Sequence, residues 1–314
     1  MSVVGTTVAL IQVVLVIAGG PLLVGAMRRV RARLEGRAGP SVTQPWRDLR
    51  KLMEKQRFRP DSTSWVFGAA PLVLVASAIL VTAIVPFLTT RSGLDHSGDL
   101  FAVVYLLLLG SVFLALGGLD PGTAFGGMGS SREMTIGALA EPALLLAIFA
   151  LSIHAGSSDL GAIVTATLSD PMSMASPASL LAGAALAVVI LAETGRLPVD
   201  NPSTHLELTM VHEAMILEYS GPDLALVEVA AQMRLVIFLG LLANLFVPWG
   251  VATTTHPLEL AFAGVAVGLK VGLLGLVVAT VEVFVAKLRL FRVPELLAAS
   301  FVLAFLAVAA SFVL

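Results

Sequence analysis

Long apolar runs alternate with short polar stretches along almost the whole chain. Eight runs are long enough to cross a bilayer as a helix, which needs about 20 apolar residues. They cover residues 3–27, 65–88, 99–118, 133–155, 177–195, 224–248, 258–286 and 294–313. Within each run the apolar residues are continuous and do not alternate with polar ones. The pattern therefore predicts membrane-spanning helices and not barrel strands.

Residues 45–57 (PWRDLRKLMEKQR) are too polar to span a bilayer. Apolar positions recur there at helical spacing and charged positions take the other face: Trp46, Leu49, Leu52 and Met53 against Arg47, Asp48, Arg50, Lys51 and Lys55. This pattern predicts an amphipathic helix at the membrane interface, which serves either as a lipid anchor or as a docking site for a partner.

The composition agrees with a membrane protein. Of the 314 residues, 57% are hydrophobic and 13% are charged, whereas a soluble domain carries roughly 25% charged residues. We expect one integral membrane domain over residues 1–314, multi-pass in the cell (inner) membrane. Its fold class is an all-α membrane protein with about eight transmembrane helices plus the interfacial helix. The glycine-rich stretch 117–131 matches no nucleotide-binding motif, and we expect it to be a flexible cytoplasmic loop.

The basic residues predict the orientation. Eleven of the 19 Lys and Arg lie between Arg28 and Arg59, and five more fall in other loops on the same predicted side. Only Arg91 falls on the opposite side, while Arg234 and Lys270 lie inside predicted spans. Since basic loops stay in the cytoplasm, both termini are predicted to face outward.

The chain has no cysteine, which excludes disulfides and Cys-ligated iron–sulfur or nickel centres. Its five histidines show no metal-binding spacing, because His205 and His212 lie two helical turns apart. No metal site and no catalytic residue are therefore expected on this chain, and nothing points to nucleic acid.

Acidic residues are concentrated between residues 191 and 234. Ionisable groups near membrane depth are costly and usually mark an ion or proton path, or a charged docking surface. Four carboxyls fall in different spans: Glu141, Glu193, Glu228 and Glu282. Each could be a helix–helix hydrogen-bonding group or a station of a proton relay.

Nearby charges could neutralise part of this set. Arg234 is expected to pair with a carboxylate, although the sequence does not say which one, and Arg196 follows Glu193 at a spacing that allows a local ion pair. If residues 204–219 form one helix, Glu207 and Glu218 share a face and Glu213 points elsewhere.

Three polar segments carry a family resemblance. They are GRAGPSVTQPWRDLRKLMEK (36–55), GMGSSREMTIGALAEPALL (127–145) and ETGRLPVDNPSTHLELTMVHEAMILEYSG (193–221). Together they resemble the membrane subunit shared by respiratory complex I (subunit 1, or H) and the group 4 membrane-bound nickel–iron hydrogenases. The stretch before EYSG is about three residues longer than in the complex I form, and this version resembles formate hydrogenlyase subunit 4.

The resemblance implies a coupling and anchoring role beneath a cytoplasmic redox arm. Proton-path candidates are then Glu141, Glu193, Glu207, Glu213, Glu218, Glu228, Glu282, Arg234 and Lys270. Partner-docking candidates are Arg47, Arg50, Lys51, Arg196 and Asp200. Iron–sulfur clusters and the nickel–iron centre are expected on hydrophilic iron–sulfur and hydrogenase-like large subunits, and antiporter-like membrane subunits are the other expected partners.

Other functions stay open. The first alternative is a complex I subunit that helps to house quinone, and the second is a stand-alone proton-coupled transporter. No internal repeat supports a transporter. An inert anchor is a further possibility, but it would gain nothing from the ionisable groups inside its spans.

Overall fold

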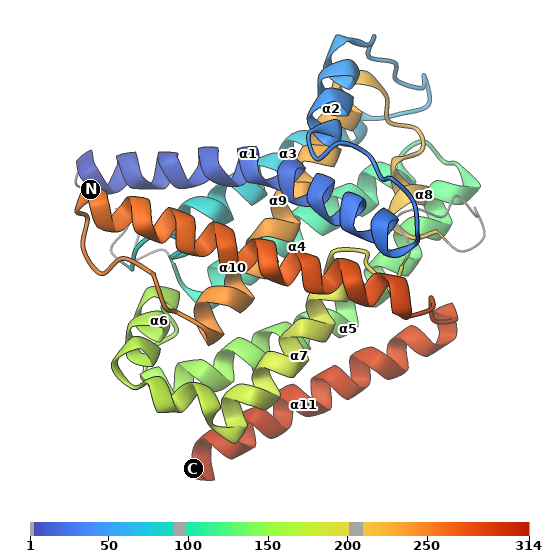
Figure 1. Cartoon of the computed structure of the whole chain (residues 1–314). Coiled ribbons are helices and arrows are strands. Elements are labelled where there is room, and N and C mark those ends of the chain that lie inside the picture. The colour runs from blue at the N-terminus through green and yellow to red at the C-terminus, as the bar shows by residue number, and fades with distance from the viewer. Residues whose placement is uncertain (1–2, 91–97, 201–209, 314) are drawn as a thin grey trace.

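The structure is a computed structural model that describes residues 3–90, 98–200 and 210–313. Its described part is built from helices packed side by side (Figure 1). In chain order they are α1 (Val3–Leu34), α2 (Gln44–Glu54), α3 (Trp65–Ile84), α4 (Leu100–Leu119), α5 (Ala124–Ala155), α6 (Leu160–Ser169), η2 (Pro171–Ala175), α7 (Pro177–Glu193), α8 (His212–Ile216), α9 (Gly221–Phe246), α10 (Pro257–Phe284), η3 (Leu290–Arg292) and α11 (Val293–Val313).

The predicted all-helical membrane fold is confirmed. Seven of the described helices are long and apolar enough to cross a membrane, namely α1, α3, α4, α5, α9, α10 and α11. The remaining expected span is α7, which is apolar but has only 17 residues, the lower end of the usual range. The count of eight crossings therefore stays a prediction.

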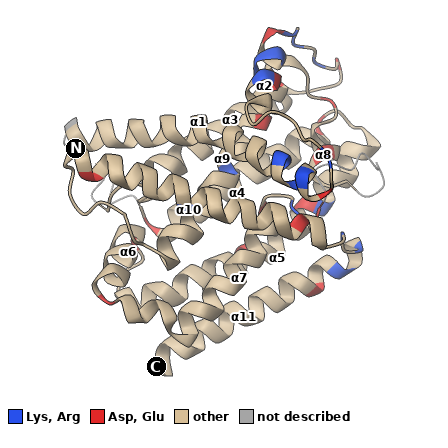
Figure 2. Cartoon of the chain, viewed as in Figure 1, with Lys and Arg blue, Asp and Glu red and all other residues tan. Residues whose placement is uncertain are grey.

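Charged side chains gather at one end of the bundle, which we call the basic end. Figure 2 shows Lys and Arg over the last turns of α1, over α2 and beside the start of α11. Helices α1 and α10 begin at the opposite end, and α11 returns to it, so the chain's two ends lie on the same side of the bundle (Figure 1). The side of the membrane that the basic end faces stays a prediction.

Two predicted boundaries were wrong at the basic end. Helix α1 continues through its arginines to Leu34. A helix needs apolar side chains only inside the bilayer, so it can continue beyond the bilayer with polar ones. The stretch predicted to be a flexible loop, 117–131, is mostly helical, since α4 ends at Leu119 and α5 begins at Ala124. Thr123 caps α5 by accepting a hydrogen bond from the amide of Gly126.

The glycines in this stretch serve close packing. A Cβ added at Gly126 would lie 2.2 Å from the carbonyl oxygen of Gly118, and one at Gly129 would lie 2.9 Å from Ala214 Cβ. Helices α4, α5 and α8 therefore approach one another at positions that only glycine allows, and this packing outweighs the low helix propensity of glycine.

Residues 204–219, considered above as one possible helix, do not form a single helix in their described part. Only His212–Ile216 is helical there, and the chain then turns before α9 starts at Gly221. Gly221 has φ +53, which allows this turn. The segment 201–209, including Glu207, lies outside the described residues.

The interfacial helix is present as α2. Its buried residues, Pro45 and Leu49, pack against the bundle, where α2 contacts α1 and α9. Trp46 and Met53 belong to the same predicted apolar face but are 38% and 57% exposed. The protein itself therefore covers only part of that face.

Labelling will test the orientation. Cysteines placed at exposed Ser41 on the basic end and at exposed Thr253 on the other end should react from opposite sides of sealed vesicles. We expect position 41 to react only from the cytoplasmic side, because the basic loops stay there. The cysteine-free chain is the control. Reaction of position 41 from outside would reverse the orientation.

Candidate functional site

A polar cavity lies inside the bundle near the basic end, between α1, α5, α7, α8 and α9. It has a volume of about 110 Å³, room for several water molecules. Its ionisable lining residues are Arg28, Glu133, Glu193, Arg196, Asp200, His212, Glu213, Glu228 and Arg234. We call it the carboxylate cavity.

The central contact of the carboxylate cavity is an ion pair between α9 and α7. Arg234 Nη2 lies 3.0 Å from Glu193 Oε2, and their side chains are only 9% and 10% exposed. Arg234 Nη1 also donates a 2.7 Å hydrogen bond to Ser111 Oγ on α4. The expected carboxylate partner of Arg234 is thus Glu193, and the local Glu193–Arg196 pair is not formed.

Sequence reasoning missed Glu133. It stands in the third turn of α5 and lines the carboxylate cavity, where it interacts electrostatically with His212 and Arg234. Glu141, about two turns further along α5, is partly buried and within electrostatic range of Arg234 and Glu193. The sequence spacing could have shown that Glu133 faces the interior, because Glu133 shares a helix face with buried Ile136 and Ala140.

Three polar atoms of the residues that line the carboxylate cavity have no hydrogen-bond partner among the described residues. They are Arg196 Nε, Gln232 Oε1 and Arg234 Nε. Buried polar atoms nearly always bind another polar group or water. The size and polar lining of the cavity therefore suit a hydrated site.

Next to the cavity, a second cluster of ion pairs holds the basic end together. Glu282 of α10, whose side chain is 2% exposed, lies between Arg196 Nη1 at 3.3 Å and Arg31 Nη1 at 3.6 Å. Burial lowers the pKa of the Arg196 guanidinium, but Arg stays charged at neutral pH. Glu282 thus joins α1, α10 and the segment after α7.

Asp200 anchors the start of the α8 region. One carboxylate oxygen lies 2.6 Å from Lys287 Nζ, and the other accepts hydrogen bonds from the backbone amides of Val211 and His212 at 3.2 and 3.3 Å. Arg196 and Asp200 were expected to dock a partner, but their side chains form ion pairs within this protein. Arg47, Arg50 and Lys51 lie exposed on α2, with Arg50 Nε 3.0 Å from Glu54 Oε1.

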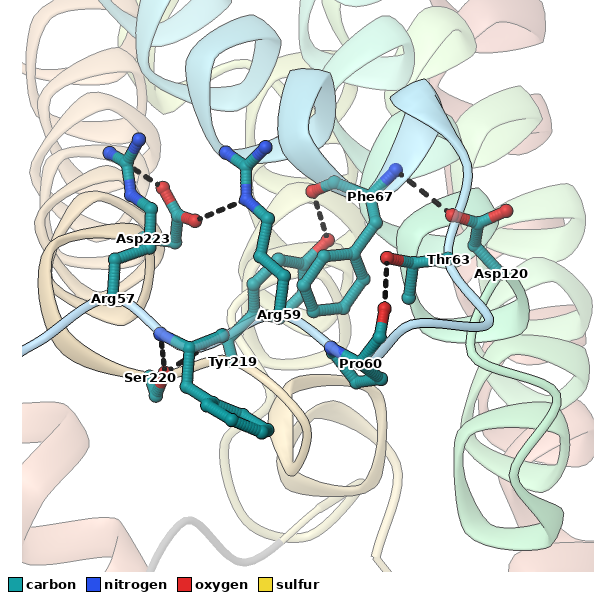
Figure 3. Close-up of polar contacts among 10 residues, drawn as sticks. Arg57, Arg59, Pro60, Thr63, Phe67, Asp120, Tyr219, Ser220 and Asp223 are labelled. Atoms are coloured by element: carbon teal, nitrogen blue, oxygen red, sulfur yellow. Dashed lines mark hydrogen bonds and ion pairs between the residues drawn. The ribbon is translucent and has the colours of Figure 1, made fainter.

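Residues 55–64, which we call the strap, connect α2 to α3 across the start of α9. Asp223 in the first turn of α9 binds two strap arginines, with Arg57 Nη2 at 3.0 Å and Arg59 Nε at 3.2 Å. Ser220 Oγ accepts from the amide of Phe58 and donates to its carbonyl. Figure 3 shows these contacts along one side of the strap.

An aromatic pair sits directly behind the strap. The rings of Phe67 and Tyr219 stack with centroids 4.1 Å apart, and the Tyr219 hydroxyl donates to the Phe67 carbonyl at 3.1 Å (Figure 3). Burial raises the pKa of the Tyr219 phenol, so the hydroxyl stays a donor. Asp120 accepts the amide hydrogens of Ser64 and Phe67 at the start of α3.

Lys270 is separate from the carboxylate cavity. Its Nζ donates to Asn244 Oδ1 at 2.7 Å and to the Val247 carbonyl at 2.9 Å. Asn244 in turn donates to the Pro86 and Phe87 carbonyls. Asn244 follows Arg234 by ten residues of α9, about 15 Å along the helix. The two predicted intramembrane cations thus occupy different clusters.

The other proton-path candidates have different places. Glu213 and Glu228 line the carboxylate cavity, whereas Glu218 is partly buried in the turn after α8. Within the described ranges, no three His, Asp or Glu side chains are grouped as metal ligands would be. The described site is therefore a cluster of ionisable groups, suited to holding charge, water and protons.

The fold and the cavity define a multi-pass helical membrane protein with an ionisable interior. The chain belongs to the NADH dehydrogenase family, which matches residues 6–313. It is 36% identical to formate hydrogenlyase subunit 4 of Escherichia coli over 95% of this chain and 96% of that protein. It is 35% identical to hydrogenase-4 component C of the same organism, over 90% and 87%. The resemblance predicted from the sequence is confirmed.

More distant relatives extend the family. The chain is 31% identical to the H subunit of the NADH-quinone oxidoreductase of Syntrophotalea carbinolica over 71% of each protein. A chain in the structure of the membrane-bound sulfane sulfur reductase, an archaeal respiratory membrane complex, has the same fold. Its TM-score is 0.85 at 22% identity, with 98% of this chain and 99% of that chain covered.

Proposed function

We propose that this chain is the membrane-embedded anchoring and proton-coupling subunit of a redox complex of the formate hydrogenlyase and group 4 hydrogenase type. Iron–sulfur and nickel–iron centres then belong to cytoplasmic partner subunits, since a chain without cysteine offers no thiolate ligands. The chain links that arm to antiporter-like, proton-translocating membrane subunits.

The observation that carries this proposal is the carboxylate cavity. Glu133, Glu193 and Glu228 come from three different helices and line one space together with Arg234. If these carboxyls only joined pairs of helices, they would not need to lie together around one cavity that suits water. Grouped carboxyls near a guanidinium can exchange protons through water, which is the arrangement a relay requires.

The docking part of the proposal is supported by α2 and the strap. Exposed Arg47 and Lys51 stand one turn apart on α2, and Phe58 on the strap is 73% exposed. The strap backbone is fixed by Ser220 and Asp223. A fixed backbone presenting an aromatic side chain among cations suits an acidic protein surface.

A quinone-site subunit of complex I is the second candidate, because a membrane component of NADH-quinone oxidoreductase is also a relative. It is the weaker one. Identity is lower, and less of the chain is covered, than with formate hydrogenlyase subunit 4.

Purification of the native complex in mild detergent tests the proposal. We expect this chain to co-purify with an iron–sulfur subunit and with a large subunit that carries two CxxC motifs and nickel. Recovery with a flavin-containing NADH-oxidising arm and bound quinone would support the second candidate. Recovery of the chain as a lone homo-oligomer would contradict both and favour a transporter.

Charge reversal on α2 tests the docking surface. Changing Arg47 and Lys51 to Glu should lower the affinity of the soluble arm by about tenfold or more at physiological salt, because cations at a charged contact become repulsive. Pull-down stoichiometry measures this. The matched control changes exposed Arg289 and Arg292 at the same end of the bundle to Glu. Equal arm retention in both variants would leave α2 as a lipid anchor only.

A further inference from the structure

An apolar groove runs along the seam between α1 and α10. It consists of two hollows, with volumes of about 450 and 730 Å³, that share Leu15, Leu88 and Gly264. Apart from Gln12, Thr7 and Thr255, the lining is apolar. Figure 1 shows α1 and α10 lying side by side along this seam. We call it the α1–α10 groove.

Glycines create the groove. Gly264, Gly268 and Gly272 follow one another at four-residue intervals along α10 and line it. A Cβ added at Gly268, at Gly272 or at Gly19 of α1 would meet no atom within 4 Å. At Gly275 the helices do touch, because a Cβ there would lie 2.6 Å from Leu23 Cδ1. The seam is therefore open from Gly272 towards Pro257. At Gly275 the two helices touch through Leu23, but Leu22 and Ala26 of α1 still line the groove beside this contact.

These open glycines are not explained by helix packing. Glycine inside a helix is destabilising relative to Ala, and at Gly268 and Gly272 none of the described helices occupies the space in which a side chain would lie. The open part covers about 15 residues of α10, or about 22 Å. That length exceeds the ~15 Å hydrocarbon depth of one leaflet, so an extended acyl chain fits along it.

The basic end of the groove supplies charge. Leu15, Gly19, Leu22 and Ala26 line it from α1, and at the same helical spacing this face continues to Arg29 and Arg33. Within the part of the chain that the structure describes, neither of these arginines has an ion pair, whereas Arg31 pairs with Glu282. Arg29 lies one turn beyond Ala26, where a lipid headgroup would meet the groove.

We propose that the α1–α10 groove binds an acyl chain of an anionic phospholipid and that Arg29 and Arg33 bind the headgroup phosphate. The apolar lining excludes a polar ligand, and the two neighbouring arginines favour a negative headgroup over a zwitterionic one. This site is separate from the carboxylate cavity and does not depend on the function proposed for it.

The test uses the complex purified in detergent, with dioleoyl phosphatidylglycerol as probe. Native mass spectrometry should count one retained phosphatidylglycerol more on the wild type than on Gly268→Leu/Gly272→Leu, which fills the groove. Both positions have room for a side chain, and Leu favours the helix, so this variant should fold. Arg29→Gln/Arg33→Gln should weaken binding roughly tenfold or more.

Controls separate the possible sources of binding. Arg289→Gln/Arg292→Gln should retain wild-type binding, and dioleoyl phosphatidylethanolamine should bind more weakly than phosphatidylglycerol. Inorganic phosphate should not protect the wild type against heating, because it has no acyl chain. Equal lipid counts for the wild type and the groove-filled variant would overturn the proposal. Loss of a membrane subunit from the groove-filled complex would also overturn it, since the groove would then be a protein interface.

Discussion

Arg234→Gln is expected to destabilise the protein by on the order of 3–5 kcal/mol, the cost of leaving one member of a buried ion pair without its partner. Arg234 Nη2 lies 3.0 Å from Glu193 Oε2, and both side chains are about one tenth exposed. The double variant Arg234→Gln/Glu193→Gln should recover much of the loss, because two amides can hydrogen-bond without charge. Thermal unfolding in detergent at one pH measures both.

The chain offers a matched control for this cycle. Arg50 and Glu54 form an ion pair of the same length, 3.0 Å, with side chains 84% and 64% exposed. Exposed pairs contribute only about 0–1 kcal/mol, so Arg50→Gln should scarcely change the unfolding temperature. If Arg234→Gln proves as mild as Arg50→Gln, the interior pair does not stabilise the bundle.

Glu133→Gln is expected to leave the complex assembled and to lower coupled turnover by about tenfold or more. Glu193→Gln should lower the turnover of the assembled complex in the same way, but it should also destabilise the protein, because it leaves Arg234 without its buried partner. Glutamine keeps the shape and the hydrogen bonding of the carboxyl but cannot take up or release a proton. A carboxyl that only forms a hydrogen bond should tolerate the change at less than about 1.5 kcal/mol. Glu141→Gln, on the same helix as Glu133, should show the same defect. Turnover and proton uptake of sealed vesicles are the measurements.

The control for the relay is Glu259→Gln. Glu259 is exposed in the first turn of α10, at the end of the bundle away from the carboxylate cavity. It should keep wild-type turnover and proton uptake. Normal values for Glu133→Gln, Glu141→Gln and Glu193→Gln would refute the relay, and loss of assembly in all three would assign these carboxyls a structural role instead.

The sequence predicted the helical membrane fold because apolar runs depend on local composition alone. It missed features that tertiary contacts decide. The 117–131 stretch resembles a loop when only its glycines are counted, yet Gly118 and Gly126 let α4 and α5 pack closely. Likewise α1 continues to Leu34 after its apolar run has ended.

The sequence predicted which types of residue would lie in the site, but not which of them would contact one another. Arg234 was expected to meet a carboxylate, but Glu193 is 41 positions away, and only the packing of α7 against α9 selects it. Glu133 escaped notice because it stands where a polar stretch meets an apolar run, the least certain place to set a helix boundary. The cluster of Arg31, Arg196 and Glu282 also joins segments that no local pattern connects.

Helix α9 has one further consequence for how the molecule can move. It is a single helix of 26 residues, a rod of about 39 Å. In its first turn Asp223 forms ion pairs with the strap, and three turns later Arg234 forms an ion pair with Glu193. Near its last turn Asn244 accepts a hydrogen bond from Lys270. Because α9 is rigid along its length, a displacement of the strap has two possible results. Either it stays within the strap, or it moves α9 as a whole and shifts the Arg234–Glu193 and Asn244–Lys270 contacts together.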